Sequence, residues 1–351
     1  MPIRFAIIGY GGMGSYHVQE LMAKETAIEV AGIYDIDPQA LAKATAQGLK
    51  TFASYEEALA DETVEAVLIA TPNDSHKALA IQALTAGKHV VCEKPVTLST
   101  AELSEVLEVA NKTQKVFMVH QNRRWDPDFL IVKRLVEERQ IGEIVQLESR
   151  VQGANGIPGD WRHLKQHGGG MLLDWGVHLF DQIMWLSQSP LKEIRTDLSY
   201  ILGDEVDDGF HSYLIFEDGL RVVIEVGTSN YTKLPRWYIK GLSGTARIDD
   251  WDLSGEIIKA TGSKEKVPRP IQAGVGLTKT MAPPSEEAAE AISFPEVPST
   301  TSFYQNFYDV VRNDAEPVVK NEEVYQVLAM LETILTEAES HYESAATTIT
   351  K

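Results

Sequence analysis

The sequence predicts an α/β fold in two parts: an N-terminal doubly wound parallel sheet, and a C-terminal α/β domain built on an antiparallel sheet. Over the first 120 residues, short apolar runs alternate with helix-like segments, which is typical of βαβ units. After Gln121, strand-like segments follow one another with few helices between them, which favours antiparallel pairing. The 351 residues are too many for one ordinary core. We therefore expect two domains, residues 1–121 and 122–351.

The strands expected in the first domain are short continuous apolar runs: Ile3–Ile8, Glu29–Tyr34, Val64–Ala70, His89–Cys92 and Val116–Val119. The helix-like segments between them are Ser15–Lys24, Pro38–Gln47, Ser75–Ala86 and Thr100–Asn111. Strands without polar alternation are usually buried on both faces, so helices should cover both sides of this sheet. Right-handed crossovers then give the doubly wound arrangement.

The second domain is expected to combine helices with a sheet whose strands alternate in polarity. The helix-like segments are Asp126–Gln140, Gly170–Ser187, Phe303–Asn313 and Glu322–Ser340. The expected strands are Ile144–Gln152, Ile194–Leu202, Gly209–Phe216, Leu220–Val226 and Arg236–Gly241. Residues 260–300 are rich in Pro, Gly, Ser and Glu, and we expect a long loop or arm there. One face of the sheet would pack on helices, and the other would need a ligand or a partner subunit.

The composition excludes several classes of partner. The formal net charge is −19, which repels nucleic-acid phosphates and anionic lipid, so we expect no nucleic-acid and no membrane partner. The only cysteine is Cys92, so no intrachain disulfide can form, and a reducing cytoplasm is the expected location. The apolar run at the N-terminus is too short for a signal peptide or a membrane span.

The first expected strand is followed by a G-x-G-x-x-G motif, Gly9-Tyr10-Gly11-Gly12-Met13-Gly14. Between a strand and a helix, these glycines allow a tight turn and close approach of the backbone to a pyrophosphate. The N-terminus of the following helix adds free N–H groups and a positive dipole end. The alternative is a glycine-rich turn that binds nothing, but its position predicts a dinucleotide site.

Asp35 follows the second expected strand, 21 residues after Gly14. A carboxylate at this place accepts hydrogen bonds from the adenosine ribose and repels a 2′-phosphate. No Arg or Lys stands next to it, so we predict NAD as the cofactor and regard NADP as less favoured. Asp35 could instead cap the helix after Pro38, although Asp37 is better placed for that role.

Two further segments follow expected strands and should face the same crevice, because ligands bind at the carboxyl ends of parallel strands. They are Thr71-Pro72-Asn73-Asp74-Ser75-His76 and Glu93-Lys94-Pro95. Lys94 would place a cation beside the nicotinamide, although a lysine is more often a solvated surface charge. Cys92 lies in an apolar run and is interpreted as an inert buried residue.

A third group follows three glycines, Gly168–Gly170, in an expected helix. Helical spacing would put Asp174, His178 and Asp181 on one face, and an imidazole beside a carboxylate can move protons near neutral pH. A lone helical histidine is usually structural, but the paired Asp favours catalysis. The same residues could bind a divalent ion. Because no second histidine lies at fitting spacing, we predict no metal.

Together these motifs resemble the Gfo/Idh/MocA family, which includes glucose–fructose oxidoreductase and inositol dehydrogenases. The similarity covers nearly the whole chain and includes Asn122-Arg123-Arg124-Trp125-Asp126-Pro127 and Asp160-Trp161-Arg162. It implies an N-terminal Rossmann domain and a C-terminal domain with a large, mostly antiparallel sheet. It also implies Lys94, Asp174 and His178 as the catalytic set, and a homodimer or homotetramer formed through the sheet face.

The expected function is transfer of a hydride between a secondary alcohol of a sugar or cyclitol and NAD. The expected cofactor-binding residues are Gly9, Tyr10, Gly11, Gly12, Met13, Gly14, Asp35, Thr71, Pro72, Asn73, His76, Glu93 and Lys94. The expected substrate-binding residues are Lys94, Arg124, Trp161, Arg162, Asp174 and His178. Two alternatives stay open: an enzyme that retains NAD during elimination or glycoside cleavage, and a sugar-sensing regulator that is not an enzyme.

Overall fold

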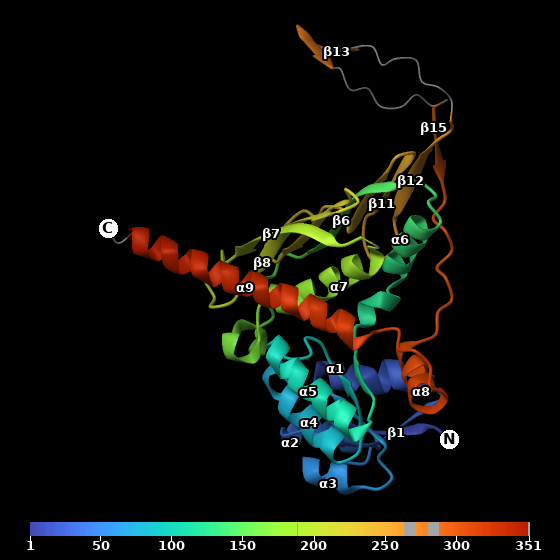
Figure 1. Ribbon diagram of the computed structural model, residues 1–351, viewed down its shortest axis with the longest axis vertical. Helices are drawn as coiled ribbons and strands as arrows, with labels where there is room; N and C mark the ends of the chain where they lie inside the picture. The colour runs from blue at the N-terminus through green and yellow to red at the C-terminus, as the bar shows by residue number, and fades with distance from the viewer. Residues whose placement is uncertain (188, 263–270, 280–287, 350–351) are drawn as a thin grey trace.

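The first domain is a parallel sheet covered by helices, as Figure 1 shows. The computed structural model describes residues 1–187, 189–262, 271–279 and 288–349. Within these residues the five-stranded sheet has the order β2-β1-β3-β4-β5, and all its pairings are parallel. Its strands are β1 (Ile3–Ile8), β2 (Ile28–Tyr34), β3 (Ala66–Ile69), β4 (His89–Cys92) and β5 (Phe117–Val119). The predicted doubly wound sheet is confirmed.

Several helices of this domain begin where the sequence supplies a side-chain acceptor. The Asp37 side chain accepts from the backbone N–H of Gln39, and the Ser99 side chain accepts from that of Glu102, so both satisfy free helix-end donors. The chain forms α1 (Gly12–Tyr16), η1 (His17–Leu21), η2 (Met22–Lys24), α2 (Pro38–Ala46), α3 (Tyr55–Ala60), η3 (Asn73–Ser75), α4 (His76–Thr85) and α5 (Thr100–Thr113). Helix α3 was not predicted, because six residues carry too little periodicity to identify a helix.

The second sheet has the order β15-β12-β11-β10-β6-β9-β8-β7 in the described part of the chain. It is mostly antiparallel, and β6 pairs with β9 in parallel. Its strands are β6 (Ile144–Gln152), β7 (Leu191–Ser199), β8 (Gly209–Phe216), β9 (Arg221–Gly227), β10 (Trp237–Gly241), β11 (Gly244–Ile248), β12 (Gly255–Ala260) and β15 (Ala289–Ile292). The predicted sheet is confirmed. Strands β11, β12 and β15 were missed, since runs of four to six residues alternate too little to be recognised.

The segment 260–300 is only partly the loop that we expected. Strand β15 lies within it and adds to the edge of the large sheet through Ile292 opposite Ile257. A hairpin of β13 (Ile271–Gly274) and β14 (Leu277–Lys279) forms a separate two-stranded sheet away from the body of the domain (Figure 1). Residues 263–270 and 280–287 lie outside the described residues.

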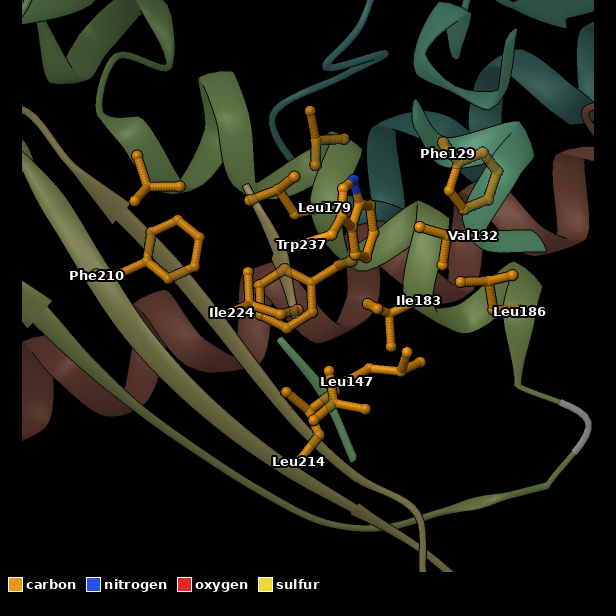
Figure 2. Packing of buried hydrophobic residues seen from close by; sticks show 14 of the residues in the cluster. Phe129, Val132, Leu147, Leu179, Ile183, Leu186, Phe210, Leu214, Ile224 and Trp237 are labelled. Atoms are coloured by element: carbon orange, nitrogen blue, oxygen red, sulfur yellow. The ribbon is translucent and has the colours of Figure 1, made fainter. Parts of the chain in front are cut away.

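One face of the large sheet packs on helices that lie between the sheet and the first domain (Figure 1). These helices are α6 (Pro127–Glu137), α7 (Val177–Leu186) and α9 (Asn321–Ile349), with the π-turn η7 (Leu172–Gly176) directly before α7. Figure 2 shows Leu179, Ile183 and Leu186 of α7 among side chains of the sheet. Burial of this apolar surface holds helix α7, and with it the adjoining turn, against the sheet.

The end of the chain returns to the first domain. In α8 (Phe303–Asn313), Phe303, Tyr304 and Phe307 belong to the same buried cluster as Phe5 of β1. Val324 and Leu328 of α9 join the cluster on the other side of that sheet. A division by sequence order at residue 121 therefore separates the two sheets but not the two cores. Across the described residues, no helix combines the length and apolarity needed to cross a membrane.

Candidate active site

The glycine turn after β1 has two tight positions and two open ones. Gly9 has a φ of +90°, and a Cβ there would lie 2.6 Å from the carbonyl oxygen of Ala70. A Cβ on Gly14 would lie 1.9 Å from the carbonyl oxygen of Gly9. At Gly11 and Gly12, a Cβ would meet nothing within 4 Å. The turn thus keeps its backbone accessible beside a helix N-terminus, which fits a pyrophosphate group.

Asp35 is fixed against this turn. Its Oδ2 accepts from the backbone N–H of Tyr10 at 2.6 Å, and its Oδ1 accepts from that of Asp37 at 2.8 Å. The side chain of Tyr10 is buried and donates to Gln47, so it is not directed toward a ligand. Each Asp35 oxygen keeps a second lone pair, and the residue is half-buried. It can therefore still accept ribose hydroxyls.

The segment after β3 connects neighbouring loops. Both ring nitrogens of His76 lie 3.0 Å from backbone carbonyl oxygens, those of Pro95 and Thr71, and burial lowers the pKa of His76. The Asn73 amide donates to the carbonyl oxygen of Gly168 at 3.1 Å. The side chains of Asn73 and His76 therefore bind protein atoms, and Pro72 with Thr71 forms the strand end beside them.

Glu93 is enclosed within the protein. It is 5% exposed, and its Oε1 accepts from His17 Nε2 and His120 Nδ1, both at 2.7 Å. The carboxylate is thus engaged by protein groups, and it does not reach a cofactor directly. Sequence reasoning missed both histidines. The available signals were that His17 stands three residues after Gly14 and that His120 directly follows β5.

Lys94 joins the two domains. Its ammonium donates to Asp174 Oδ1 at 3.0 Å and to the Asp174 carbonyl oxygen at 2.9 Å. Arg162 lies 3.3 Å from the other carboxylate oxygen. Burial alone would raise the pKa of Asp174, but Lys94 and Arg162 together lower it. The structure therefore brings Lys94, Asp174 and Arg162 together as the sequence predicted, with Asp174 as an ionised bridge between two cations.

His178 lies on α7, one turn beyond Asp174, but the two side chains do not form the expected pair. Its Nδ1 is buried and has no hydrogen-bond partner among the described residues. Burial, followed by the positive charges of Lys94 and Arg123, holds the pKa of His178 well below its usual value. The imidazole is therefore neutral at pH 7 and can accept a proton.

Asp181 does not join the cluster around Asp174, which corrects the prediction that helical spacing would bring them together. Its carboxylate forms a two-fold contact with Arg124, with distances of 2.6 and 2.8 Å. The π-turn η7 lies between Asp174 and the regular helix that carries Asp181, so α-helical spacing does not extend from one to the other.

Arg124 is locked in the interior. It also donates to Glu323 and to the carbonyl oxygen of Val318, and its side chain is 1% exposed. It therefore holds α7 to α9 and is not free to bind a substrate as we expected. Its neighbour Arg123, which the prediction passed over, lies over the rings of Trp175 and Trp251, 5.1 and 5.5 Å from their centroids.

Trp161 and Arg162 occupy the short helix η5 (Trp161–His163), beside Asp174. The Arg162 guanidinium lies 4.6 Å from the ring centroid of Trp161 and 2.6 Å from Asp160. Both side chains are half-buried. This predicted pair thus lies at the margin of the cluster, where a substrate could meet it.

Comparison with known proteins agrees with this geometry. Residues 3–121 match the oxidoreductase family with an NAD-binding Rossmann fold, and residues 129–247 match the GFO/IDH/MocA C-terminal domain. The chain belongs to the GFO/IDH/MocA oxidoreductase family. A solved structure described as an NAD-binding protein from Listeria innocua is 56% identical, with a TM-score of 0.88 over 97% of this chain and 96% of that one.

The chain spans about half the length of several of the curated relatives that it matches. An uncharacterized oxidoreductase of Schizosaccharomyces pombe is 34% identical over 54% of this chain and 53% of that protein. An inositol 2-dehydrogenase of Corynebacterium glutamicum is 31% identical over 55% of this chain and 56% of that protein. The chain therefore belongs to a family of oxidoreductases with an NAD-binding Rossmann fold, and inositol 2-dehydrogenases are among its relatives.

Asp207 gives a testable prediction about the stability of the active-site helix. Its Oδ2 accepts from the backbone N–H of Leu172, at the start of η7, at 2.8 Å. Burial raises the pKa of Asp207 to about 7. A carboxyl group with a raised pKa stabilises the fold below its unfolded pKa and loses that contribution as pH rises through the folded one. In the wild type, the free energy of unfolding should therefore fall by a few kcal/mol between about pH 4 and pH 8, at about 1.4 kcal/mol for each pH unit. We expect Asp207→Asn, which keeps an acceptor oxygen, to remove this fall.

Urea denaturation across this pH range measures the effect. Asp218→Asn is the matched control, since Asp218 also accepts from one backbone N–H, that of Leu220, but is exposed. If the free energy of unfolding depends on pH in the same way for wild type and Asp207→Asn, the raised pKa of Asp207 is contradicted.

Proposed function

We propose that the protein is an NAD-dependent dehydrogenase that interconverts a secondary alcohol of a sugar or cyclitol and the corresponding ketone. The observation that carries this proposal is the contact of Lys94, from the cofactor domain, with Asp174 on the turn that leads to His178. These groups lie beside the carboxyl ends of the parallel strands, the region where this class of sheet binds its ligands. The inositol 2-dehydrogenase relatives support a polyol substrate.

Each group has a role that its environment supports. His178, neutral at pH 7, accepts the hydroxyl proton. The Lys94 ammonium donates a hydrogen bond to the alcohol oxygen and favours its developing negative charge. Asp174 holds Lys94 and Arg162 in place. Bound NAD would supply the hydride acceptor.

The residues of the first domain fit this cofactor. The open positions at Gly11 and Gly12 would hold the pyrophosphate, and Asp35 would hold the adenosine ribose. Thr71, Pro72 and Lys94 would flank the nicotinamide half. Trp161 and Arg162 would contact the substrate. We also propose a cytoplasmic homodimer or homotetramer: the single cysteine, Cys92, is buried and free, and Figure 1 draws the helices on one side of the large sheet.

A panel of sugars, inositols and other polyols, assayed for NADH formation, tests the proposed reaction. Net oxidation should appear as NADH that accumulates with substrate consumption. If substrate disappears without NADH, the protein retains its cofactor through a redox-neutral elimination or glycoside cleavage. If no polyol reacts but one binds, a sensing role replaces the enzymatic one.

We expect catalytic efficiency with NAD to exceed that with NADP by about tenfold or more, because Asp35 would lie against the added 2′-phosphate and like charges repel. Steady-state kinetics with both cofactors measure this preference. Asp35→Asn, which keeps an acceptor for the Tyr10 N–H, should narrow the difference. Equal use of NADP by the wild type would show that Asp35 does not bind the ribose. Lys43, whose ammonium lies 5.6 Å from the Tyr10 ring centroid, would then be the candidate group for the 2′-phosphate.

A further inference from the structure

Four buried polar side chains from four separate elements form one hydrogen-bonded network behind Lys94. Glu93 follows β4, His120 follows β5, His17 begins η1, and Tyr304 belongs to α8. His17 and His120 both contact Glu93 Oε1 at 2.7 Å, and the Tyr304 hydroxyl lies 2.5 Å from the other nitrogen of His17. None of the four is more than 5% exposed. The proposed reaction does not use this network, so its presence beside the active site needs another explanation.

Glu93 is the charged member of the network. Its second oxygen accepts from the backbone N–H of Lys94 at 3.2 Å, so three N–H groups surround the carboxylate, which favours its ionised form. Burial alone would raise the pKa of Glu93, but His120 and His17 outweigh it and hold the pKa well below the usual value.

Burial holds two other members of the network neutral: it lowers the pKa of His17 and raises that of Tyr304. A protonated Tyr304 can therefore donate to a neutral His17, which in turn donates from Nε2 to Glu93. His120 donates from Nδ1 to the same oxygen of Glu93.

The nearby cations are already paired. Lys94 is bound to Asp174, and Arg162 lies against both Asp174 and Asp160. In His178, the proposed base, the imidazole is neutral at pH 7. The Glu93 carboxylate therefore stands apart from the ion pairs that Lys94 and Arg162 form with Asp174 and Asp160.

The position of Glu93 indicates what this charge could act on. Asp35 at the end of β2 marks the adenosine half of the proposed cofactor site, so the end of β4 belongs to the nicotinamide half. A nicotinamide ring carries a positive charge when oxidised and none when reduced. We propose that the buried Glu93 carboxylate is an electrostatic site for the oxidised ring, which makes the protein bind NAD⁺ more tightly relative to NADH than a neutral network would. This inference rests on the proposed cofactor, and it assigns Glu93 a role through charge, without contact.

A metal ion is the competing interpretation of the same residues. The ligand atoms of His17, Glu93 and His120 lie within 4.8 Å of one another, and two imidazoles with a carboxylate suit a transition metal. However, both imidazoles lie at hydrogen-bond distance from the same oxygen, so these contacts are satisfied without an ion. The test below separates the two interpretations.

The experiment compares dissociation constants for NAD⁺ and NADH by isothermal titration calorimetry on the full chain. Glu93→Gln removes the charge and keeps the shape, and Glu93→Met is a second neutral variant of similar length. Tyr304→Phe is the matched control, because it perturbs the network without removing charge. Thermal unfolding of each variant establishes that it folds. We expect both neutral variants to lower the preference for NAD⁺ over NADH by about tenfold, and Tyr304→Phe to leave it within about twofold.

Each outcome decides the proposal. An unchanged preference in the folded neutral variants, or an equal shift in Tyr304→Phe, would overturn it. Stoichiometric Zn²⁺ that survives dialysis of the wild type and is lost from Glu93→Gln would also overturn it in favour of a metal site. If the wild type binds neither cofactor, the proposed cofactor fails and this inference fails with it. If both cofactors bind but no polyol reacts, only the proposed reaction fails.

Discussion

Lys94→Ala and His178→Gln should each lower turnover by about 10²-fold or more, because general acid–base catalysis is typically worth about 10²–10⁴-fold. Lys94→Ala removes the cation that would favour the developing alkoxide, and His178→Gln removes the proton acceptor. Cofactor binding should change little, since the glycine turn and Asp35 are untouched. Single-turnover rates with the polyol found in the substrate screen, and NAD titration by fluorescence, measure the two effects separately.

Matched surface variants control for charge and ring loss elsewhere. Lys77→Ala removes a lysine of α4 that pairs with Glu105, and His211→Gln removes an exposed histidine of β8; both should keep wild-type turnover. If His178→Gln stays fully active, another group is the base, and Lys94 becomes the leading candidate. If Lys94→Ala loses NAD affinity as much as rate, its main role is to hold the cofactor.

Gly14→Ala should lower the free energy of unfolding by about 3 kcal/mol or more, because overpacking a fixed backbone is among the most destabilising changes. The new Cβ would lie 1.9 Å from the carbonyl oxygen of Gly9, a backbone atom that cannot move without opening the turn. We therefore also expect NAD binding to be lost. Urea denaturation measures the stability, and calorimetric titration measures the affinity.

Gly12→Ala is the matched control in the same turn. Its Cβ would meet no atom within 4 Å, so stability should change by no more than about 1 kcal/mol, in line with a glycine-to-alanine change in a helix. Any loss of NAD affinity in Gly12→Ala then reports contact with the ligand itself. Equal destabilisation by the two substitutions would show that the turn does not have the described geometry.

The sequence identified the candidate site through residues that stand at element ends. Lys94 follows β4 and Asp35 follows β2, and the carboxyl ends of parallel strands meet at one edge. Once the strands are recognised, the approximate positions of such residues follow. The same reasoning assigned Glu93 to the cofactor, but it could not indicate that His17 and His120 enclose that carboxylate. Those histidines come from separate elements, and no local pattern links them.

The helix that carries His178 shows a second feature that the sequence could not predict. Regular α-helical spacing placed Asp181 with Asp174 and His178, whereas in the structure Asp181 binds Arg124. The π-turn η7, which interrupts the spacing after Asp174, leaves almost no signature in the sequence, because the apolar positions before and after it remain apolar. The contact of Asp181 with Arg124 joins residues 57 positions apart, and no local pattern predicts it.

The sequence by itself determined most of the strands and helices and their order, the glycine turn and the placement of Lys94 and Asp35. These features depend on residues that are neighbours along the chain: the alternation of apolar runs with helix-like segments, helix capping and the steric demands of glycine. Only the tertiary structure decided that Lys94 binds Asp174, 80 residues away, and that α8 closes the network around Glu93 through Tyr304. These contacts depend on how two cores pack against each other, which is the sum of many weak apolar contacts and has no local sequence signal.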